Sequence, residues 1–353
     1  MKKVGIALTV IALVAAVLYA VRAPLSTALM GRVLERNIAS SLLDTLPDGL
    51  NVILCGAGGP LPDPVRSGPC VAVSAGDMLL IVDTGTGGAR NLGPLRLPVG
   101  EVDAVFLTHF HSDHIDALGE LATLRWASAA HTSPLPVHGP EGVAEVVAGF
   151  NQSYARDGVY RQAHHGDMVA PLSGHGMEAT EHPQPQDGEA VVVYDKGGLV
   201  VQMIRVQHNP VEPAVAYLFT YKGRSALISG DTVKSANLQH FAKDIDLLVH
   251  EGLSPHLVQQ MNRAAVRAGN DIVARITTDI PDYHTTPVEA AEIARDAGVG
   301  HLLFYHVVPP TPLPGLKTAW LAGVDAVFEH HTLGQNGTGF SLPADSTAII
   351  PID

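Results

Sequence analysis

The chain has 353 residues, 46% of them apolar, which excludes a disordered or fibrous protein and is enough for one large domain or two small ones. Its formal net charge is -13, from 22 Lys and Arg against 35 Asp and Glu. Because proteins that follow a nucleic-acid backbone usually carry a basic face, this balance disfavours nucleic acid as a partner and favours a small or neutral substrate.

The first 22 residues are predicted to be a signal peptide or a membrane anchor. Two lysines precede an uncharged, mostly apolar run over residues 4–21, and Arg22 follows it. A basic start before an apolar stretch is typical of both kinds of segment, and the run is near the ~18 residues of a spanning helix. No small-x-small cleavage site stands out before Pro24, which favours an uncleaved anchor. We therefore expect an exported protein, periplasmic or anchored in the inner membrane and facing the periplasm.

Residues 23–49 are predicted to be a helical linker, and residues 50–353 the functional domain. Near the start of this domain, Cys55 and Cys70 flank a short loop. They can form a disulfide if the adjoining strands pair, which would suit an exported protein. Two separate buried thiols remain the alternative.

Strands alternate with helices through the rest of the chain. Short apolar runs predict strands at residues 50–54, 71–73, 78–82, 102–107, 135–138, 190–194, 199–206, 214–221, 225–229, 247–250 and 301–305. Helical patterns occur at residues 114–126, 141–154 and 287–297. Residues 155–188 lack periodicity and are rich in Gly, Pro and His, so we predict an inserted loop or lid. Two sets of strands with helices outside them indicate an α+β fold with two sheets.

The strongest motif follows the predicted strand at residues 102–107. It contains four candidate ligands within six residues: His109, His111, Asp113 and His114. Packing does not explain such a cluster, because without a cation several polar groups would be poorly satisfied at a strand end. Imidazole nitrogens and a carboxylate oxygen are ligands that Zn²⁺ prefers, so the motif predicts a metal site.

This motif resembles the HxHxDH signature of the metallo-beta-lactamase superfamily. Further segments resemble its ribonuclease Z-like members in the same order along the chain: 56–60, 83–85, 229–232, 250–252, 284–287 and 305–306. The resemblance implies the superfamily's four-layer αβ/βα sandwich over residues 50–310.

The resemblance also implies a ligand set for two divalent metal ions, for which Zn²⁺ is the expected identity. His109, His111 and His208 would hold one metal, Asp113, His114 and His306 the second, and Asp231 would bridge them. His138, also at a strand end, is the rival of His208. Two such cations can activate a shared water and stabilise the leaving oxygen.

Asp113 and His284 are the candidate catalytic residues. By the resemblance, His284 would act as a general acid or stabilise the transition state; a loop histidine without a role is the alternative. Asp83 is a candidate acceptor that orients a ligand histidine, or else a residue that caps a turn. His250 and Glu251 are expected to support the site.

The substrate prediction rests on weaker features. The C-terminal segments at residues 315–323, 332–337 and 341–343 resemble arylsulfatase-like members. Together with the charge and the export segment, they favour hydrolysis of a small aryl sulfate, phosphodiester or lactone outside the cytoplasm. The alternatives are a ribonuclease Z-type transfer RNA 3′-processing endonuclease, a non-catalytic metal-binding module and, more weakly, a β-lactam hydrolase. A homodimer stays open.

Overall fold

The computed structural model describes residues 2–352, which divide after Thr45 into two units. The first unit consists of helix α1 (Lys2–Ala39) and the turn η1 (Leu43–Thr45). The helix continues through Pro24, so the predicted boundary at residue 22 is not a break in structure. Residues 6–35 have the length and the mean hydropathy, 2.3, to cross a membrane, as a signal sequence also has.

The second unit is built on two sheets of the described strands. In the first sheet the order is β15 (Ile350–Ile352), β14 (Gly339–Pro343), β1 (Gly49–Gly56), β2 (Cys70–Ala75), β3 (Met78–Val82), β4 (Val102–Phe106), β5 (Leu135–Pro140), β6 (Met177–His182). In the second it is β13 (His331–Leu333), β12 (His301–Val308), β11 (Leu247–Leu253), β10 (Arg224–Ile228), β9 (Val215–Tyr221), β8 (Leu199–Arg205), β7 (Ala190–Lys196). Every predicted strand is confirmed, whereas β6, β13, β14 and β15 were not predicted.

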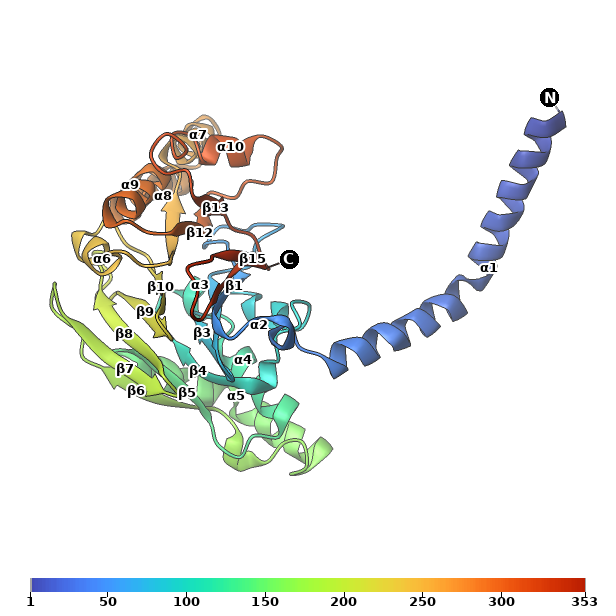
Figure 1. Cartoon of the computed structure of the whole chain (residues 1–353), viewed down its shortest axis with the longest axis horizontal. Coiled ribbons are helices and arrows are strands. Elements are labelled where there is room, and N and C mark those ends of the chain that lie inside the picture. The colour runs from blue at the N-terminus through green and yellow to red at the C-terminus, as the bar shows by residue number, and fades with distance from the viewer. Residues whose placement is uncertain (1, 353) are drawn as a thin grey trace. The chain divides into compact units, whose positions relative to one another are not determined.

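Helices cover the outer faces of both sheets (Figure 1). Beside the first sheet lie α2 (Gly88–Asn91), α3 (Ser112–Ile115), α4 (Leu118–Ala129) and α5 (Val143–His165). Beside the second lie α6 (Ala236–Phe241) and α9 (Pro287–Ala297), and the remaining helices are α7 (Pro255–Arg267), α8 (Asp271–Asp279) and α10 (Leu316–Trp320). Strands β3 to β6 run parallel, as do β10 to β13. Parallel neighbours need crossover connections, and these helices provide several of them.

The main core lies between the sheets and contains side chains from both, among them Val73, Phe106, Tyr217, Phe219 and Tyr305. A second core packs α6 and α9 on the outer face of the second sheet. Strand β3, antiparallel to β2 and parallel to β4, is buried along its whole length, as expected of a strand covered on both faces. The predicted helix–sheet–sheet–helix arrangement is therefore confirmed for the second unit.

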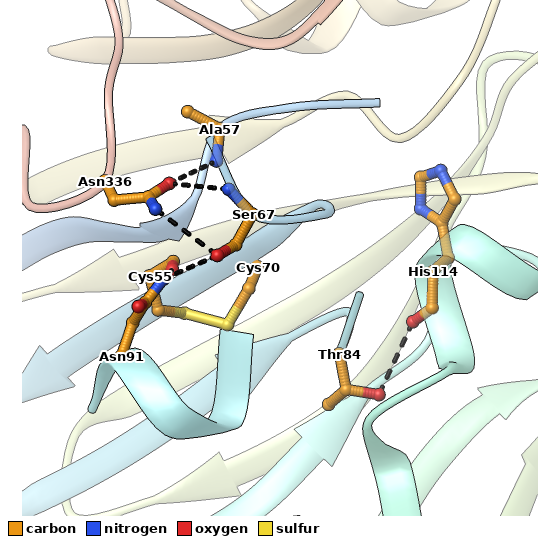
Figure 2. Close-up of a disulfide and its surroundings, with 8 residues drawn as sticks. All are labelled: Cys55, Ala57, Ser67, Cys70, Thr84, Asn91, His114 and Asn336. Atoms are coloured by element: carbon orange, nitrogen blue, oxygen red, sulfur yellow. Dashed lines mark hydrogen bonds between the residues drawn. A yellow bond between two sulfur atoms is a disulfide. The ribbon is translucent and has the colours of Figure 1, made fainter. Parts of the chain in front are cut away.

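The loop between β1 and β2 is tied down at both ends (Figure 2). Cys55 and Cys70 form a disulfide, which resolves the alternative left open by the sequence. The amide of Asn91 donates to the Cys55 carbonyl at 2.6 Å, and Asn336 Oδ1 accepts from the backbone N–H groups of Ala57 and Ser67. These bonds fix the glycine- and proline-rich segment 56–69 on the body of the domain.

The predicted loop at residues 155–188 was wrong in its local structure. Helix α5 extends to His165, and β6 pairs in parallel with β5. A side chain on Gly158 of α5 would collide with His175, since its Cβ would lie 2.5 Å from the imidazole. This close packing holds the polar end of the helix in place.

Candidate metal centre

The predicted ligands come from the carboxyl ends of strands in both sheets. Asp83 follows β3, the His109–His114 motif follows β4, His208 follows β8, Asp231 follows β10, and His306 lies near the end of β12. In parallel sheets these ends meet at one edge, which is where ligands usually bind. Both Asp83 and His306 have positive φ, 56° and 45°, a conformation that is uncommon outside glycine and is often found at functional sites.

One group of side chains surrounds a first candidate metal position. Single donor atoms of His109, His111, His208 and Asp231 lie within 4.8 Å of one another. The Nε2 atom of His109 lies 3.0 Å from His111 Nδ1 and 3.8 Å from Asp231 Oδ2. His208 Nε2 is 3.4 Å from His111 Nδ1, and its Nδ1 donates to the Tyr283 carbonyl at 2.9 Å. The backbone contact leaves Nε2 of His208 unprotonated and turned towards the group.

A second group lies on the other side of Asp231. Donor atoms of Asp113, His114 and His306 again lie within 4.8 Å of one another. His306 Nε2 is 3.2 Å from Asp113 Oδ2 and 3.4 Å from Asp231 Oδ2, and His114 Nε2 is 3.3 Å from Asp231 Oδ1. Asp231 thus borders both groups, as a bridging ligand must.

The side chains fit divalent cations. His114 Nε2 and Asp231 Oδ1 are buried, face each other and make no hydrogen bond within residues 2–352. Burial alone would lower the pKa of His114, but Asp231, Asp83 and Asp113 outweigh it and raise that pKa well above its usual range. Buried carboxylates therefore demand positive charge at this point. Divalent cations with neutral imidazole ligands would meet that demand and satisfy both atoms.

Asp83 orients the His114 imidazole of the second group through its Nδ1 atom. Its Oδ1 accepts from the Thr108 backbone N–H at 2.8 Å, and its Oδ2 accepts from the Thr108 hydroxyl at 2.8 Å. The same Oδ2 lies 2.8 Å from His114 Nδ1. A carboxylate acceptor at Nδ1 places the proton there and leaves Nε2 free to bind a metal.

His284 is paired with Glu251 beside the metal centre. Its Nδ1 lies 3.1 Å from Glu251 Oε1, which also accepts from the Thr285 backbone N–H at 2.9 Å. Burial lowers the pKa of His284, but Glu251 and Asp231 outweigh burial and raise it to about 9. Donor atoms of His284, Asp231 and His306 lie within 4.8 Å of one another, so the imidazole faces the reacting region.

Some residues take different places from those expected. His138, the rival of His208, stacks on His182, with Nδ1 to Nε2 at 3.1 Å, and belongs to neither ligand group. His250 bonds through Nδ1 to the Glu251 carbonyl, so Glu251 rather than His250 supports His284. Tyr283 was not predicted; its ring packs edge-on against His208 at 5.4 Å, and its position directly before His284 is the signal that the sequence offers.

A cleft of about 760 Å³ opens beside the second group. It is lined by the 59–68 part of the disulfide-tied loop, by Thr86 and Gly87, and by Ser112, Asp113 and Asp116. Gly59 lies so close to His306 that a Cβ there would be 2.9 Å from the imidazole Cε1. The loop therefore forms one wall of the space in which a substrate would meet the metal centre.

The layered fold and the histidine–aspartate cluster at its strand ends together define a metallo-hydrolase. A profile of the metallo-beta-lactamase superfamily matches residues 63–276, and the chain belongs to this superfamily. It is a hydrolase acting on ester bonds.

Among its relatives, the chain is 35% identical over 275 residues to ribonuclease Z of Mycobacterium bovis, covering 77% of this chain and 91% of that one. It is 34% identical to ribonuclease Z of Mycobacterium marinum over 275 residues, which are 77% of this chain and 91% of that one. The fold is shared with YhfI of Bacillus subtilis (19% identity, TM-score 0.58, 83% of this chain and 98% of that one). It is also shared with the short form of human tRNase Z, ELAC1 (20% identity, TM-score 0.57, 83% and 99%).

These relatives correct two predictions. The expected small-ester hydrolase outside the cytoplasm is wrong as the main function, because the similar curated proteins are ribonuclease Z enzymes. The arylsulfatase-like resemblance is likewise not supported. The expectation that disfavoured nucleic acid as a partner is wrong for the same reason. It rested on the charge of the whole chain, which does not describe the local field at a metal centre.

Proposed function

We propose that the protein is a ribonuclease Z-type endonuclease that cleaves a phosphodiester bond at the 3′ end of transfer RNA precursors. The observation that carries this proposal is the match to ribonuclease Z over 91% of the relative's length. The gathering of the seven predicted ligands at one sheet edge supports it.

We assign the ligand roles as the resemblance implied. His109, His111 and His208 would hold one cation, Asp113, His114 and His306 the other, and Asp231 both. Nitrogen and carboxylate ligands without cysteine suit Zn²⁺. Two such cations, when bound, lower the pKa of a shared water and stabilise charge on the phosphate and leaving oxygens.

The chain's own residues complete the reaction. Asp113 lies at the cleft, where its carboxylate would accept the proton of the attacking water. His284 holds a proton through its pairing with Glu251 and would deliver it from Nε2 to the departing oxygen. Glu251 keeps the ring oriented and compensates its charge.

The test uses a transfer RNA precursor with a 3′ trailer and the Zn²⁺-loaded protein. We expect metal-dependent release of the trailer, loss of bound metal and cleavage together in Asp231→Ala, and retained metal with a rate reduced about 10²–10⁴-fold in His284→Ala. His240→Ala, an exposed histidine, is the control. No cleavage by the wild type, or full cleavage by Asp231→Ala, would refute the proposal.

We also propose that α1 is an uncleaved membrane anchor. The run of residues 4–21 carries no charge and is apolar all round, which suits lipid rather than a one-sided protein contact. Membrane fractionation with N-terminal sequencing of the mature protein tests this proposal; a soluble protein that begins after residue 22 would overturn the anchor.

A further inference from the structure

A second cavity adjoins the cleft beside the metal centre. It measures about 500 Å³ and shares Thr86, Gly87 and Asp116 with the cleft. Its far wall is made by the facing sides of α4 and α5. The two cavities adjoin at the shared residues, of which Thr86 donates a hydrogen bond to Asp116 at 2.7 Å. Side by side they make a groove that leads from Asp113 away from the metal centre, and neither the ligand set nor the His284–Glu251 pair uses its outer part.

An aromatic ring is fixed in the outer part of this groove. Tyr154 of α5 packs on Gly119 of α4, where an added Cβ would lie 2.3 Å from the ring atom Cε2. The missing side chain of Gly119, in the first turn of α4, leaves the space that the ring occupies. The tyrosine is partly exposed and lines the cavity, so it presents a preorganised flat surface.

Two guanidinium groups stand beside this ring. Arg90 pairs with Glu120 at 2.6 Å and Arg161 with Asp157 at 2.6 Å, each through Nε. Within residues 2–352, the Nη groups of both make no hydrogen bond. Each arginine therefore keeps N–H donors for an anion. The two arginines share the lining of this cavity with three carboxylates, Asp116, Glu120 and Asp157, so its formal charge is slightly negative.

We propose that this outer groove binds a nucleotide of the RNA strand next to the one at the metal centre. Its base would stack on Tyr154, and its phosphate would accept from Arg90 and Arg161. A planar base suits an aromatic ring whatever its sequence, and a phosphate suits free guanidinium N–H groups. This inference rests on the proposed function, and it adds the residues that hold the strand beyond the scissile bond.

The experiment compares a large and a small substrate on the full-length, Zn²⁺-loaded protein. The large one is a transfer RNA precursor with the trailer lengthened stepwise from one to six nucleotides. The small one is bis(4-nitrophenyl) phosphate, which reaches the metal centre only. The variants are Tyr154→Leu, Tyr154→Phe and Arg161→Gln. The matched controls are Tyr160→Leu and Arg156→Gln, exposed residues of the same helix.

We expect Tyr154→Leu to raise KM for the precursor about tenfold, the size of one lost base stack, with kcat unchanged. Tyr154→Phe keeps the ring and should restore the wild-type KM. Arg161→Gln should raise KM and weaken its dependence on salt. Turnover of the small diester should be the same in all variants, which shows that the metal centre is intact.

Failure of the nucleotide site and failure of the proposed function give different results. If the wild type cleaves the precursor and Tyr154→Leu behaves like Tyr160→Leu, the nucleotide site is refuted and the proposed function stands. If the wild type hydrolyses the small diester but neither cleaves nor binds the precursor, both are refuted. Equal losses on both substrates in Tyr154→Leu, without rescue in Tyr154→Phe, would also overturn the site, because they would place the tyrosine in the fold and not in substrate binding.

Discussion

Replacing Asp83 with Asn tests whether the Asp83 carboxylate holds the His114 imidazole in the tautomer that can bind a metal. The carboxylate of Asp83 serves three polar groups at 2.8 Å: the N–H and hydroxyl of Thr108, and Nδ1 of His114. It is completely buried, so water cannot replace a lost bond. The substitution changes one oxygen into an NH₂ group and leaves the shape of the side chain nearly unchanged.

The expected loss of metal affinity follows from the change in hydrogen-bond donors and acceptors at residue 83. An amide offers one acceptor oxygen where a carboxylate offers two. If the oxygen keeps the Thr108 N–H, the NH₂ group points at His114 Nδ1. The imidazole then favours the proton on Nε2, the atom that faces Asp231, and a protonated nitrogen cannot bind a metal. Loss of such an outer partner typically costs about 10–100-fold in metal affinity, or about 1.4–2.8 kcal/mol.

The assay is competition for Zn²⁺ against a chelator of known affinity, which resolves two binding steps. Asp83→Asn should lower the Zn²⁺ affinity of one binding step about 10–100-fold and change the affinity of the other step much less. Asp195→Asn, at an exposed position of β7, is the control for the loss of one carboxylate charge. Unchanged affinity in both steps, in a variant with the wild-type circular dichroism spectrum, would refute the orienting role of Asp83.

Three further predictions concern stability. The double substitution Cys55→Ser and Cys70→Ser should lower the free energy of unfolding by about 3 kcal/mol, since the crosslink closes a loop with a sequence separation of 15; denaturant titration should show this difference under oxidising conditions and none after reduction of the wild type. Thr286→Ala should cost about 1 kcal/mol, because Thr286 and Glu289 form a capping box at the start of α9, whereas Thr286→Ser should cost much less; equal unfolding midpoints for all three proteins would contradict the role of the cap. Removal of metal by a chelator should lower Tm, and Zn²⁺ at about 100 times its Kd should restore about 2.7 kcal/mol; a melting temperature indifferent to both treatments would argue against a metal that binds the folded state.

The sheets were predictable because their strands are short, apolar and bounded by turns. The runs at β3 and β11 are buried throughout, and local composition alone marks such strands. The end of α5 was not predictable in this way. Residues 156–165 are mostly polar and exposed, and the helix there depends on Gly158 fitting against His175, a contact with a residue that lies beyond the helix.

Some residues of the candidate site could likewise be predicted from local sequence, and others could not. The His109–His114 motif is local, so its four side chains could be proposed as ligands without any knowledge of the fold. His208, Asp231 and His306 required the resemblance, because only the two sheets bring them to the same edge. Thr108 and Tyr283 were missed, since they act through a hydroxyl and a backbone carbonyl and carry no motif of their own. The two sheets thus place donor atoms of all seven residues in two neighbouring groups.

The net charge of the whole chain gave a wrong substrate prediction for a physical reason. At physiological ionic strength the field of an exposed charge is screened beyond about 8 Å, so most of the net charge of -13 is not felt by a strand in the groove. That sum also counts Asp113 and Asp231 as free negative charges, although two divalent cations would more than neutralise both. What an RNA strand meets is the local set: the metal centre, the ring of Tyr154, and Arg90 and Arg161 with the carboxylates beside them. A surface with so few unpaired cations should bind RNA with a shallow salt dependence. A steep one would show that the main contacts lie outside this groove.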